Sequence, residues 1–183
     1  MDVMDALLNI DKTVFYFINR DCHHEALNLV MPYITEIGSG LFIFAIALIL
    51  LFFKPKRLRM SGLLLMAGLT MTYQVVRFLK NALERPRPFF DLPDANALAT
   101  AGGHSFPSNH AAMAFMAAFI LSGYFRKEYI FYTLAVLVAL SRVYLGVHYP
   151  SDVFVGGCIG LLIGYILEYV SESIKASSGT IIS

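Results

Sequence analysis

Two histidines and one carboxylate are the residues of this sequence best suited to chemistry. Asp152 follows His148 by four residues, close enough for its carboxylate to hold one ring nitrogen and to raise the basicity of the other. His110 supplies a second imidazole. Because histidine is the side chain that titrates near neutral pH, two of them suit the roles of nucleophile and general acid.

Cationic side chains in the same part of the chain could bind an anion beside these histidines. Lys80, Arg87 and Arg142 could converge on one polyanion, with the guanidinium groups binding pairs of phosphate oxygens. Ser108 and Asn109 come just before an apolar run, so we expect them at a helix N-terminus, where unpaired backbone N–H groups attract anions. This combination predicts phosphate chemistry carried out by cations and histidine.

Motifs for other mechanisms are missing from the sequence. It contains no glycine-rich phosphate-binding loop and no G-x-S-x-G motif of a serine nucleophile. No Cys/His or paired-carboxylate cluster has the spacing of metal ligands, so we predict neither a metal nor a cofactor. Cys22 and Cys158 lie far apart in the sequence and suggest no disulfide.

The amino-acid composition is that of a membrane protein. The chain has 183 residues, of which 57% are hydrophobic and 15% are charged, against roughly 25% charged residues in soluble domains. A soluble domain of this length could not bury so much apolar surface in one core. A net charge of +1 without a polar tract excludes a disordered chain, a coiled coil and a nucleic-acid-binding module.

The apolar runs predict an all-α, polytopic membrane bundle that forms a single domain over residues 1–183. A helix needs about 20 apolar residues to cross a bilayer, and by this measure we expect about five transmembrane helices. Four of them are predicted at residues 60–79, 110–125, 129–146 and 153–170.

The N-terminal third of the chain is less regular. Residues 26–53 are predicted to form the first span as one kinked helix, although they contain Pro32, Glu36 and Gly38. Residues 4–20 combine apolar side chains with four charged ones. Such a segment is expected to lie along the membrane surface as an interfacial helix.

The loop cations predict the orientation of the bundle. One group follows the first span and another follows the third, namely Lys54, Lys56, Arg57 and Arg59, then Arg126 and Lys127. Both groups should lie on the cytoplasmic side, where Lys and Arg accumulate. The acidic N-terminal region, loop 81–107 and the turn 148–152 then share the opposite side.

Loop 81–107 is too long to be a simple connection. Loops beyond roughly 12–15 residues are uncommon in compact proteins unless they serve a function. This one contains Pro86, Pro88, Pro93 and Gly102–Gly103, so we interpret it as a shaped cover. Two residues of this loop can each be interpreted in two ways. Arg85 lies either next to the phosphate or in solvent, and His104 has either a structural role or one at the rim of the substrate site.

The order and spacing of the polar residues match a known signature. Lys80 is followed by six residues and Arg87-Pro88, then by Pro107-Ser108-Asn109-His110. Ser141-Arg142, five residues, His148, three residues and Asp152 complete the set over residues 80–152. This resembles the three-part signature of the type 2 phosphatidic acid phosphatase family of membrane phosphatases. One departure is Asn109, where the family usually has glycine, but backbone N–H donation survives that change.

The resemblance implies a role for each matching residue. His148 would be the nucleophile that becomes a phosphohistidine, with Asp152 orienting its ring. His110 would protonate the leaving oxygen and later activate water. The phosphoryl group would be bound by side chains and one backbone N–H, from Lys80, Arg87, Ser108, Arg142 and Asn109.

The resemblance also implies a metal-independent lipid phosphatase at the extracytoplasmic face of a bacterial inner membrane. Its partners would be the lipid bilayer and a membrane lipid substrate, with no nucleic acid. We rank undecaprenyl diphosphate first, followed by phosphatidylglycerol phosphate and the 1-phosphate of lipid A. The pattern favours no particular oligomeric state.

Two alternatives use the same cation cluster differently. A non-catalytic lipid-phosphate-binding or transport protein could hold a phosphate with it, but would need neither of the two histidines nor Asp152. A vanadate-dependent haloperoxidase shares a similar anion site, but five membrane spans and a lipid-facing site argue against it.

Overall fold

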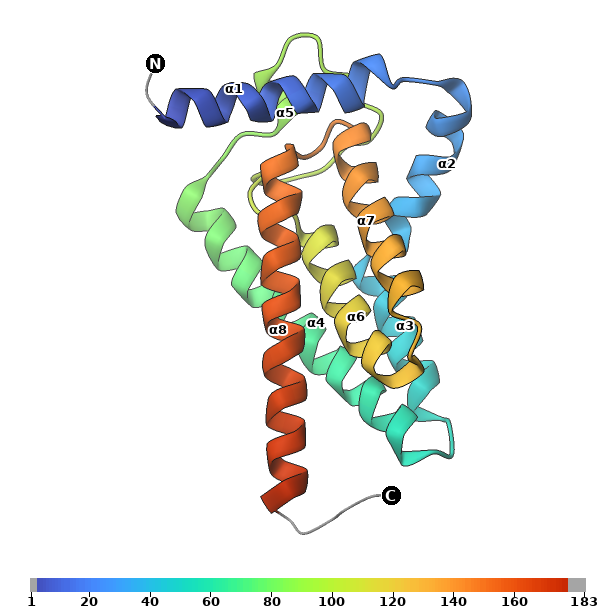
Figure 1. Cartoon of the computed structure of the whole chain (residues 1–183). Coiled ribbons are helices and arrows are strands. Elements are labelled where there is room, and N and C mark those ends of the chain that lie inside the picture. Colours follow the sequence, from blue (N-terminus) through green and yellow to red (C-terminus); the bar gives the residue numbers. More distant parts are fainter. Residues whose placement is uncertain (1–2, 178–183) are drawn as a thin grey trace.

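The computed structural model describes residues 3–177, and within this range the regular secondary structure is entirely helical (Figure 1). The prediction of an all-α bundle is therefore confirmed. The helices are α1 (Val3–Tyr16), continued by the π-helical turn η1 (Phe17–Asp21), then α2 (Glu25–Glu36), α3 (Gly40–Leu51), α4 (Lys56–Leu83), α5 (Pro88–Asp91), α6 (Asn109–Phe125), α7 (Glu128–Tyr144) and α8 (Pro150–Ser177).

Helix α1 lies across one end of the bundle, roughly perpendicular to the long helices (Figure 1). Its inner side is buried, because Phe15 packs against Tyr149 with 5.7 Å between the ring centroids. Its outer side exposes large apolar side chains such as Leu7 and Ile10. The helix predicted over residues 4–20 is thus present and amphipathic, and its place at a membrane surface stays a prediction.

Two of the described helical stretches, Lys56–Asp91 and Pro150–Ser177, are long and apolar enough by themselves to cross a bilayer. Helices α2 and α3 make a third when taken together, although they are bent by 51°. The bend lies at the break between the two helices rather than at Pro32, which is inside α2. Ser39 caps the new helix there, since its hydroxyl accepts the backbone N–H of Phe42 at 3.2 Å.

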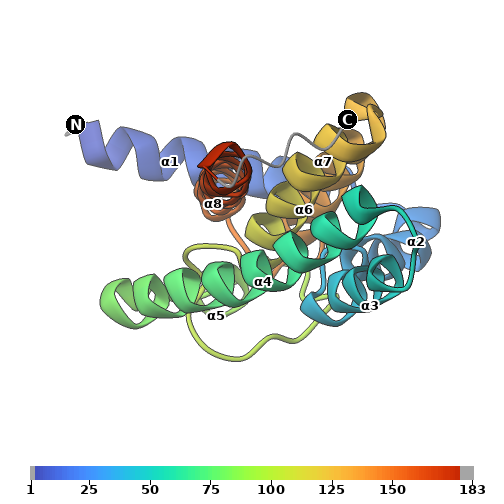
Figure 2. The same ribbon diagram turned by 90° about the horizontal axis from the view of Figure 1, so that it is seen from below.

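Helices α6 and α7 have 17 residues each, and α6 runs through the middle of the bundle, between α4, α7 and α8 (Figure 2). Small residues allow this packing. A Cβ atom added at Gly160 of α8 would lie 2.1 Å from the carbonyl oxygen of Ala112, so only glycine fits there. Ten of the 17 residues of α6 are buried, and α6 is therefore enclosed by protein along most of its length.

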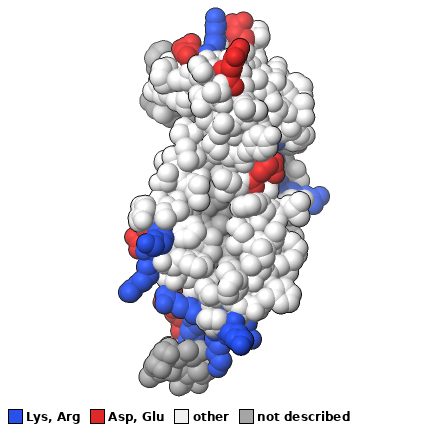
Figure 3. Space-filling model, turned by 90° about the vertical axis from the view of Figure 1, so that its right-hand side faces the viewer, with Lys and Arg blue, Asp and Glu red and all other residues white. Residues whose placement is uncertain are grey.

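The loops at the two ends of the bundle differ in charge. The six cations lie in or next to the α3–α4 and α6–α7 connections, three of them in the first residues of α4, and all six are exposed. Lys and Arg side chains gather at the end opposite α1 (Figure 3). Acidic residues gather at the α1 end in the same view. The two groups of cations thus share one end, as the alternating directions of the helices require.

Candidate functional site

The residues predicted to do chemistry come from several helices and meet at the end of the bundle that α1 covers. Lys80 lies in the last turn of α4, and the residues around His110 begin α6. Arg142 is in the last turn of α7, and Asp152 is in the first turn of α8. The turn between α7 and α8 contributes His148. Because neighbouring helices here run in opposite directions, these helix ends lie side by side.

His148 and Asp152 form a buried pair. The Nδ1 atom of His148 lies 3.3 Å from Oδ2 of Asp152, and the two side chains are 3% and 0% exposed. The same carboxylate oxygen accepts the backbone N–H of Tyr149 at 2.9 Å and the hydroxyl of Ser105. With Nδ1 held in this way, the other ring nitrogen, Nε2, is directed at the cations and lies 3.4 Å from Nη1 of Arg87.

The environment of His148 keeps its ring neutral. Burial, aided by the charges of Arg142 and Arg87, lowers the pKa of the imidazole to about 3 in spite of the opposing effect of Asp152. A neutral ring that donates from Nδ1 has a free electron pair on Nε2 at neutral pH. This is the protonation state that a nitrogen nucleophile requires.

The turn that holds His148 depends on a glycine. Gly146 has φ of 79°, in the left-handed region, and a Cβ atom there would lie 2.3 Å from the carbonyl oxygen of Asn96. Asn19 of η1 fastens the same turn, because its amide donates to the carbonyl oxygens of Asn96 and Tyr144 at 2.9 and 2.8 Å. The backbone leading to His148 is therefore fixed from two sides.

Arg87 and Lys80 are held by carbonyl groups. The guanidinium of Arg87 donates to the carbonyl oxygens of Gly102, Gly103 and Val147 at 2.8–2.9 Å. Lys80 donates to those of His104 and Ser105. Carbonyl oxygens position these cations without cancelling their charge, so the charge remains available to an anion.

These bonds also shape loop 81–107. Helix α4 ends at Leu83 because Glu84 takes a left-handed conformation, with φ of 46°, and Pro86 cannot continue a helix. The chain then returns under α1, where Arg87 and Lys80 hold residues 102–105. His104 takes part through its carbonyl group, which supports the structural interpretation of this residue.

The N-terminus of α6 presents unpaired donors. Ser108 is the N-cap, since its hydroxyl accepts the backbone N–H of Ala111 at 3.4 Å. Within the described part of the chain, the backbone N–H groups of Asn109 and His110 have no hydrogen-bond partner. The Nδ2 atom of Asn109 lies 3.7 Å from the sulfur of Met113, and its Oδ1 is buried without a partner among the described residues. The donor that Asn109 presents at the helix N-terminus is therefore its backbone N–H.

Arg142 is buried with one nitrogen bonded and another unsatisfied. Its Nη1 donates to the hydroxyl of Thr35 in α2 at 2.7 Å, and its Nε has no partner among the described residues. His110 lies close enough to interact electrostatically with Arg142 and His148. The predicted residues therefore surround a single position, and none of them lies elsewhere in the molecule.

A second set of residues, which lies outside the predicted site residues, supports the His148–Asp152 pair. Arg85 donates to Oδ1 of Asp152 at 2.6 Å and to Asp11 of α1 at 2.7 Å. Asp11, which is 8% exposed, also accepts the backbone N–H and the hydroxyl of Ser151 at 2.8 and 2.6 Å. Helix α1 is thus connected to the His148–Asp152 pair by a continuous chain of charged hydrogen bonds.

Arg85 is 22% exposed and ion-paired with Asp152 and Asp11, so it is not a free cation in solvent, and its place next to the phosphate stays a prediction. The sequence did not predict a role for Asp11 at the site, because a charged residue on an amphipathic helix is ordinarily exposed. It did not predict one for Ser105 or Thr35 either, because isolated hydroxyl residues have no distinguishing pattern. Among the described residues, no group of three or more His, Cys, Asp or Glu side chains could hold a metal ion.

Comparison with known proteins assigns this arrangement to a family. The sequence matches the PAP2 superfamily over residues 61–174. It is 32% identical over 164 residues to phosphatidylglycerophosphatase B of Bacillus subtilis, covering 81% of this chain and 77% of that protein. It is 27% identical over 169 residues to the undecaprenyl-diphosphatase BcrC of the same organism, covering 88% of this chain and 84% of the relative.

Solved structures show the same fold. The crystal structure of LpxE from Aquifex aeolicus superimposes with a TM-score of 0.79 and 31% sequence identity, covering 87% of this chain and 95% of that chain. A PAP2-type phosphatidylglycerolphosphate phosphatase from Bacillus subtilis also gives a TM-score of 0.79, at 28% identity, covering 93% of this chain and 88% of that chain.

Proposed function

Since this chain belongs to the PAP2 superfamily of membrane lipid phosphatases, we propose that it removes the terminal phosphate of a lipid phosphate or diphosphate through a phosphohistidine at His148. The observation that carries the proposal is the buried His148–Asp152 pair, with Nε2 of His148 directed at Arg87. The non-catalytic alternative gives no reason to bury and orient a neutral imidazole there.

In the first step, Nε2 of His148 attacks phosphorus and the bond from phosphorus to the lipid oxygen breaks. His110 gives a proton to that leaving oxygen. Asp152 accepts the hydrogen bond from Nδ1 throughout and stabilises the positive charge that the ring acquires. Lys80, Arg87, Arg142 and the N-terminus of α6 stabilise the charge on the transferring phosphoryl group, the kind of term that is usually largest in catalysis.

In the second step, His110 takes a proton from water, the water oxygen attacks phosphorus, and the bond from phosphorus to Nε2 breaks. Inorganic phosphate is released and His148 returns to its neutral form. Every proton in this cycle passes through His110, and Lys80, Arg87 and Arg142 supply the charge stabilisation that a metal ion would otherwise provide. Ser108 contributes as the cap that fixes the backbone of Asn109 and His110.

Phosphate release by purified protein in the presence of EDTA tests this mechanism. We expect His148→Ala to abolish turnover and to prevent labelling of the protein when the substrate carries a labelled terminal phosphate. His110→Ala should slow both the formation and the hydrolysis of the acid-labile protein-bound phosphate, because His110 acts in both steps. His23→Ala, which removes an imidazole outside the site, is the matched control. Turnover that persists in His148→Ala would contradict the assignment of His148 as the nucleophile. Dependence of turnover on an added metal would contradict the metal-independent mechanism.

For the substrate, we propose undecaprenyl diphosphate first, with phosphatidylglycerol phosphate and lipid A 1-phosphate next. Support comes from the relatives, whose names refer to undecaprenyl diphosphate and phosphatidylglycerophosphate. Initial rates on the three lipids at equal surface concentration would rank them. A faster rate on either of the other lipids would reverse the order without affecting the mechanism.

For orientation, we propose that the site faces the outside of a bacterial inner membrane. The exposed cations lie at the other end of the bundle, and such residues accumulate in the cytoplasm. Cys22 is exposed near the site end, so in a Cys158→Ser background a membrane-impermeant maleimide should label it in spheroplasts. Lys127→Cys, in a chain without the native cysteines, should react only after permeabilisation, and the reverse pattern would contradict the orientation.

A further inference from the structure

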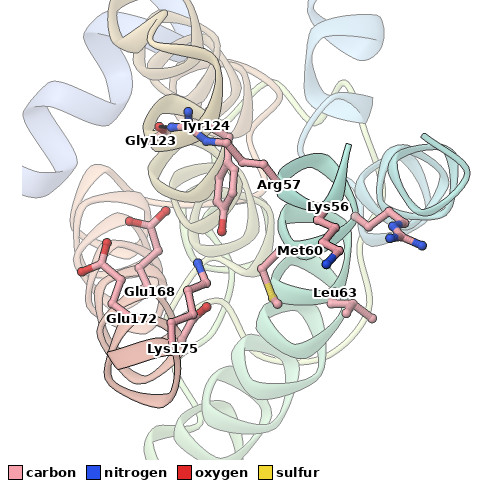
Figure 4. A pocket seen from close by; sticks show the side chains of 11 residues that line it. Lys56, Arg57, Met60, Leu63, Gly123, Tyr124, Glu168, Glu172 and Lys175 are labelled. Atoms are coloured by element: carbon pink, nitrogen blue, oxygen red, sulfur yellow. Dashed lines mark hydrogen bonds between the residues drawn. The ribbon is translucent and has the colours of Figure 1, made fainter. Parts of the chain in front are cut away.

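A cavity lies at the end of the bundle opposite the candidate functional site. It has a volume of about 640 Å³ and opens between α4, α6 and α8 (Figure 4). At a rise of 1.5 Å per residue, α8 extends about 27 Å between Pro150 and Glu168, close to the roughly 30 Å thickness of a bilayer's hydrocarbon core. With the site at one membrane surface, this cavity therefore lies at the headgroup level of the other.

The two walls of the cavity have opposite charges. Lys56, Arg57 and Arg59 line it from α4 (Figure 4). Glu168, Glu172 and Lys175 line it from α8, so the α8 wall carries one negative charge in excess. Among the described residues, no ion pair joins these three cations to either glutamate. The charges thus face each other across the cavity without closing it.

The basic wall is partly rigid. Arg57 donates to the carbonyl oxygen of Gly123 at 3.0 Å, and its guanidinium carbon lies 5.5 Å from the centre of the Tyr124 ring. These contacts fix the guanidinium on α6, and Glu168 reaches the same part of α6, where its Oε1 lies 2.9 Å from the position of a Cβ atom on Gly123. Lys56 and Arg59 are exposed and remain available to an anion.

Two further features indicate what occupies the cavity. The hydroxyl oxygen of Ser171, which lines it, is buried without a partner among the described residues, and such groups usually have an unseen partner. Met60 and Leu63 extend the lining along α4, and Leu63 is 51% exposed. The occupant thus needs a polar head and an apolar tail.

From these observations we infer that the cavity binds a phospholipid with a primary amine in its headgroup, such as phosphatidylethanolamine. Its phosphate lies against Lys56 and Arg59, and its ammonium group lies between Glu168 and Glu172. A headgroup with a negative charge and no ammonium would satisfy only the basic wall. A trimethylated amine would match both charges but could donate no hydrogen bond to the carboxylates or to Ser171.

Native mass spectrometry of the full-length protein in detergent tests this site. Phosphatidylethanolamine, phosphatidylcholine and phosphatidylglycerol with identical acyl chains are titrated separately, and the bound fraction is measured. The two lipids differ in hydrogen bonding rather than in charge, and one hydrogen bond contributes about 1 kcal/mol net, so we expect phosphatidylethanolamine to bind about fivefold more tightly than phosphatidylcholine.

The variants separate the two walls. Glu168→Gln with Glu172→Gln should remove the preference for phosphatidylethanolamine over phosphatidylcholine, whereas Arg59→Gln should weaken binding of all three lipids. Glu128→Gln, an exposed carboxylate at the same end but outside the cavity, should change nothing. His148→Ala should bind lipid like the unmodified chain, so the result is independent of the proposed hydrolysis.

Three outcomes would overturn the inference. Equal binding of phosphatidylethanolamine and phosphatidylcholine would exclude recognition of the amine. Tighter binding of phosphatidylglycerol, unaffected by the glutamate variants, would make this a site for anionic lipid. No retained lipid on protein with an intact thermal transition would mean that the walls do not bind a headgroup.

Discussion

The two ends of the bundle use the same kinds of charged residues in opposite ways. At the α1 end, Arg87, Arg142, His148 and Asp152 are each at most 6% exposed, and each is held by hydrogen bonds to neighbouring elements. At the other end, Lys56 and Arg59 are exposed beside an open cavity. Burial and fixed geometry make charges suitable for stabilising a transition state, whereas exposed charges can only attract and retain a headgroup.

The largest loss of activity is expected when Asp152, the buried carboxylate at the α1 end, loses its charge. Asp152→Asn keeps the size of the side chain but favours the wrong tautomer of His148, and kcat should fall by about 10³-fold or more, as in other orienting Asp–His pairs. Phosphate release by detergent-purified protein measures it. A loss of less than about tenfold would show that Asp152 is structural only, because removal of an orienting group costs more than that.

The pKa of His148 gives a second test, of whether burial at the α1 end keeps this imidazole neutral. Because burial lowers the pKa of His148 to about 3 from 6.5, its ring should remain neutral at pH 5. The folded pKa is below the unfolded one, so this group stabilises the fold above pH 6.5, and that stabilisation decreases as the pH falls toward 3. Ring-nitrogen NMR shifts, assigned through loss of the signal in His148→Gln, would measure it. An imidazolium signal at pH 6 would contradict the burial argument.

A smaller loss of activity is expected when the contact between Asp11 of α1 and Arg85 is weakened. Asp11→Asn removes the charge that holds Arg85 in place and should lower kcat by about tenfold, as for other residues that support a catalytic group from outside. KM should hardly change, because Asp11 does not reach the position of the phosphate. Asp5→Asn, on the exposed part of the same helix, is the control, and an equal loss there would assign the effect to membrane attachment of α1.

The smallest effect is expected at the exposed end. Arg57→Ala removes one hydrogen bond and one contact with an aromatic ring, and the cost to stability should be about 1 kcal/mol or less. The thermal midpoint should fall slightly while turnover remains unchanged. A large loss of turnover would show that the two ends are coupled, and Arg57→Lys would then identify whether the charge is responsible.

Local sequence patterns were sufficient for much of the fold. Apolar runs of the right length predicted the helices, and the loop cations predicted which loops share an end. The bounds were less accurate. The helix predicted over 60–79 extends over Lys56–Leu83, because charged residues continue a helix beyond the hydrocarbon region without cost. The predicted kink in residues 26–53 is a break between α2 and α3, where Ser39 caps the second helix.

The candidate site residues could be predicted from the chain alone, since their types and the short spacing from His148 to Asp152 are local properties. The groups that hold those residues in place became visible only in the folded arrangement. Asp11 meets Arg85 across 74 positions, and Thr35 meets Arg142 across 107. The physical reason is that these contacts arise from the packing of whole helices against one another, and no short pattern around Asp11 or Thr35 indicates which helix end will lie beside it.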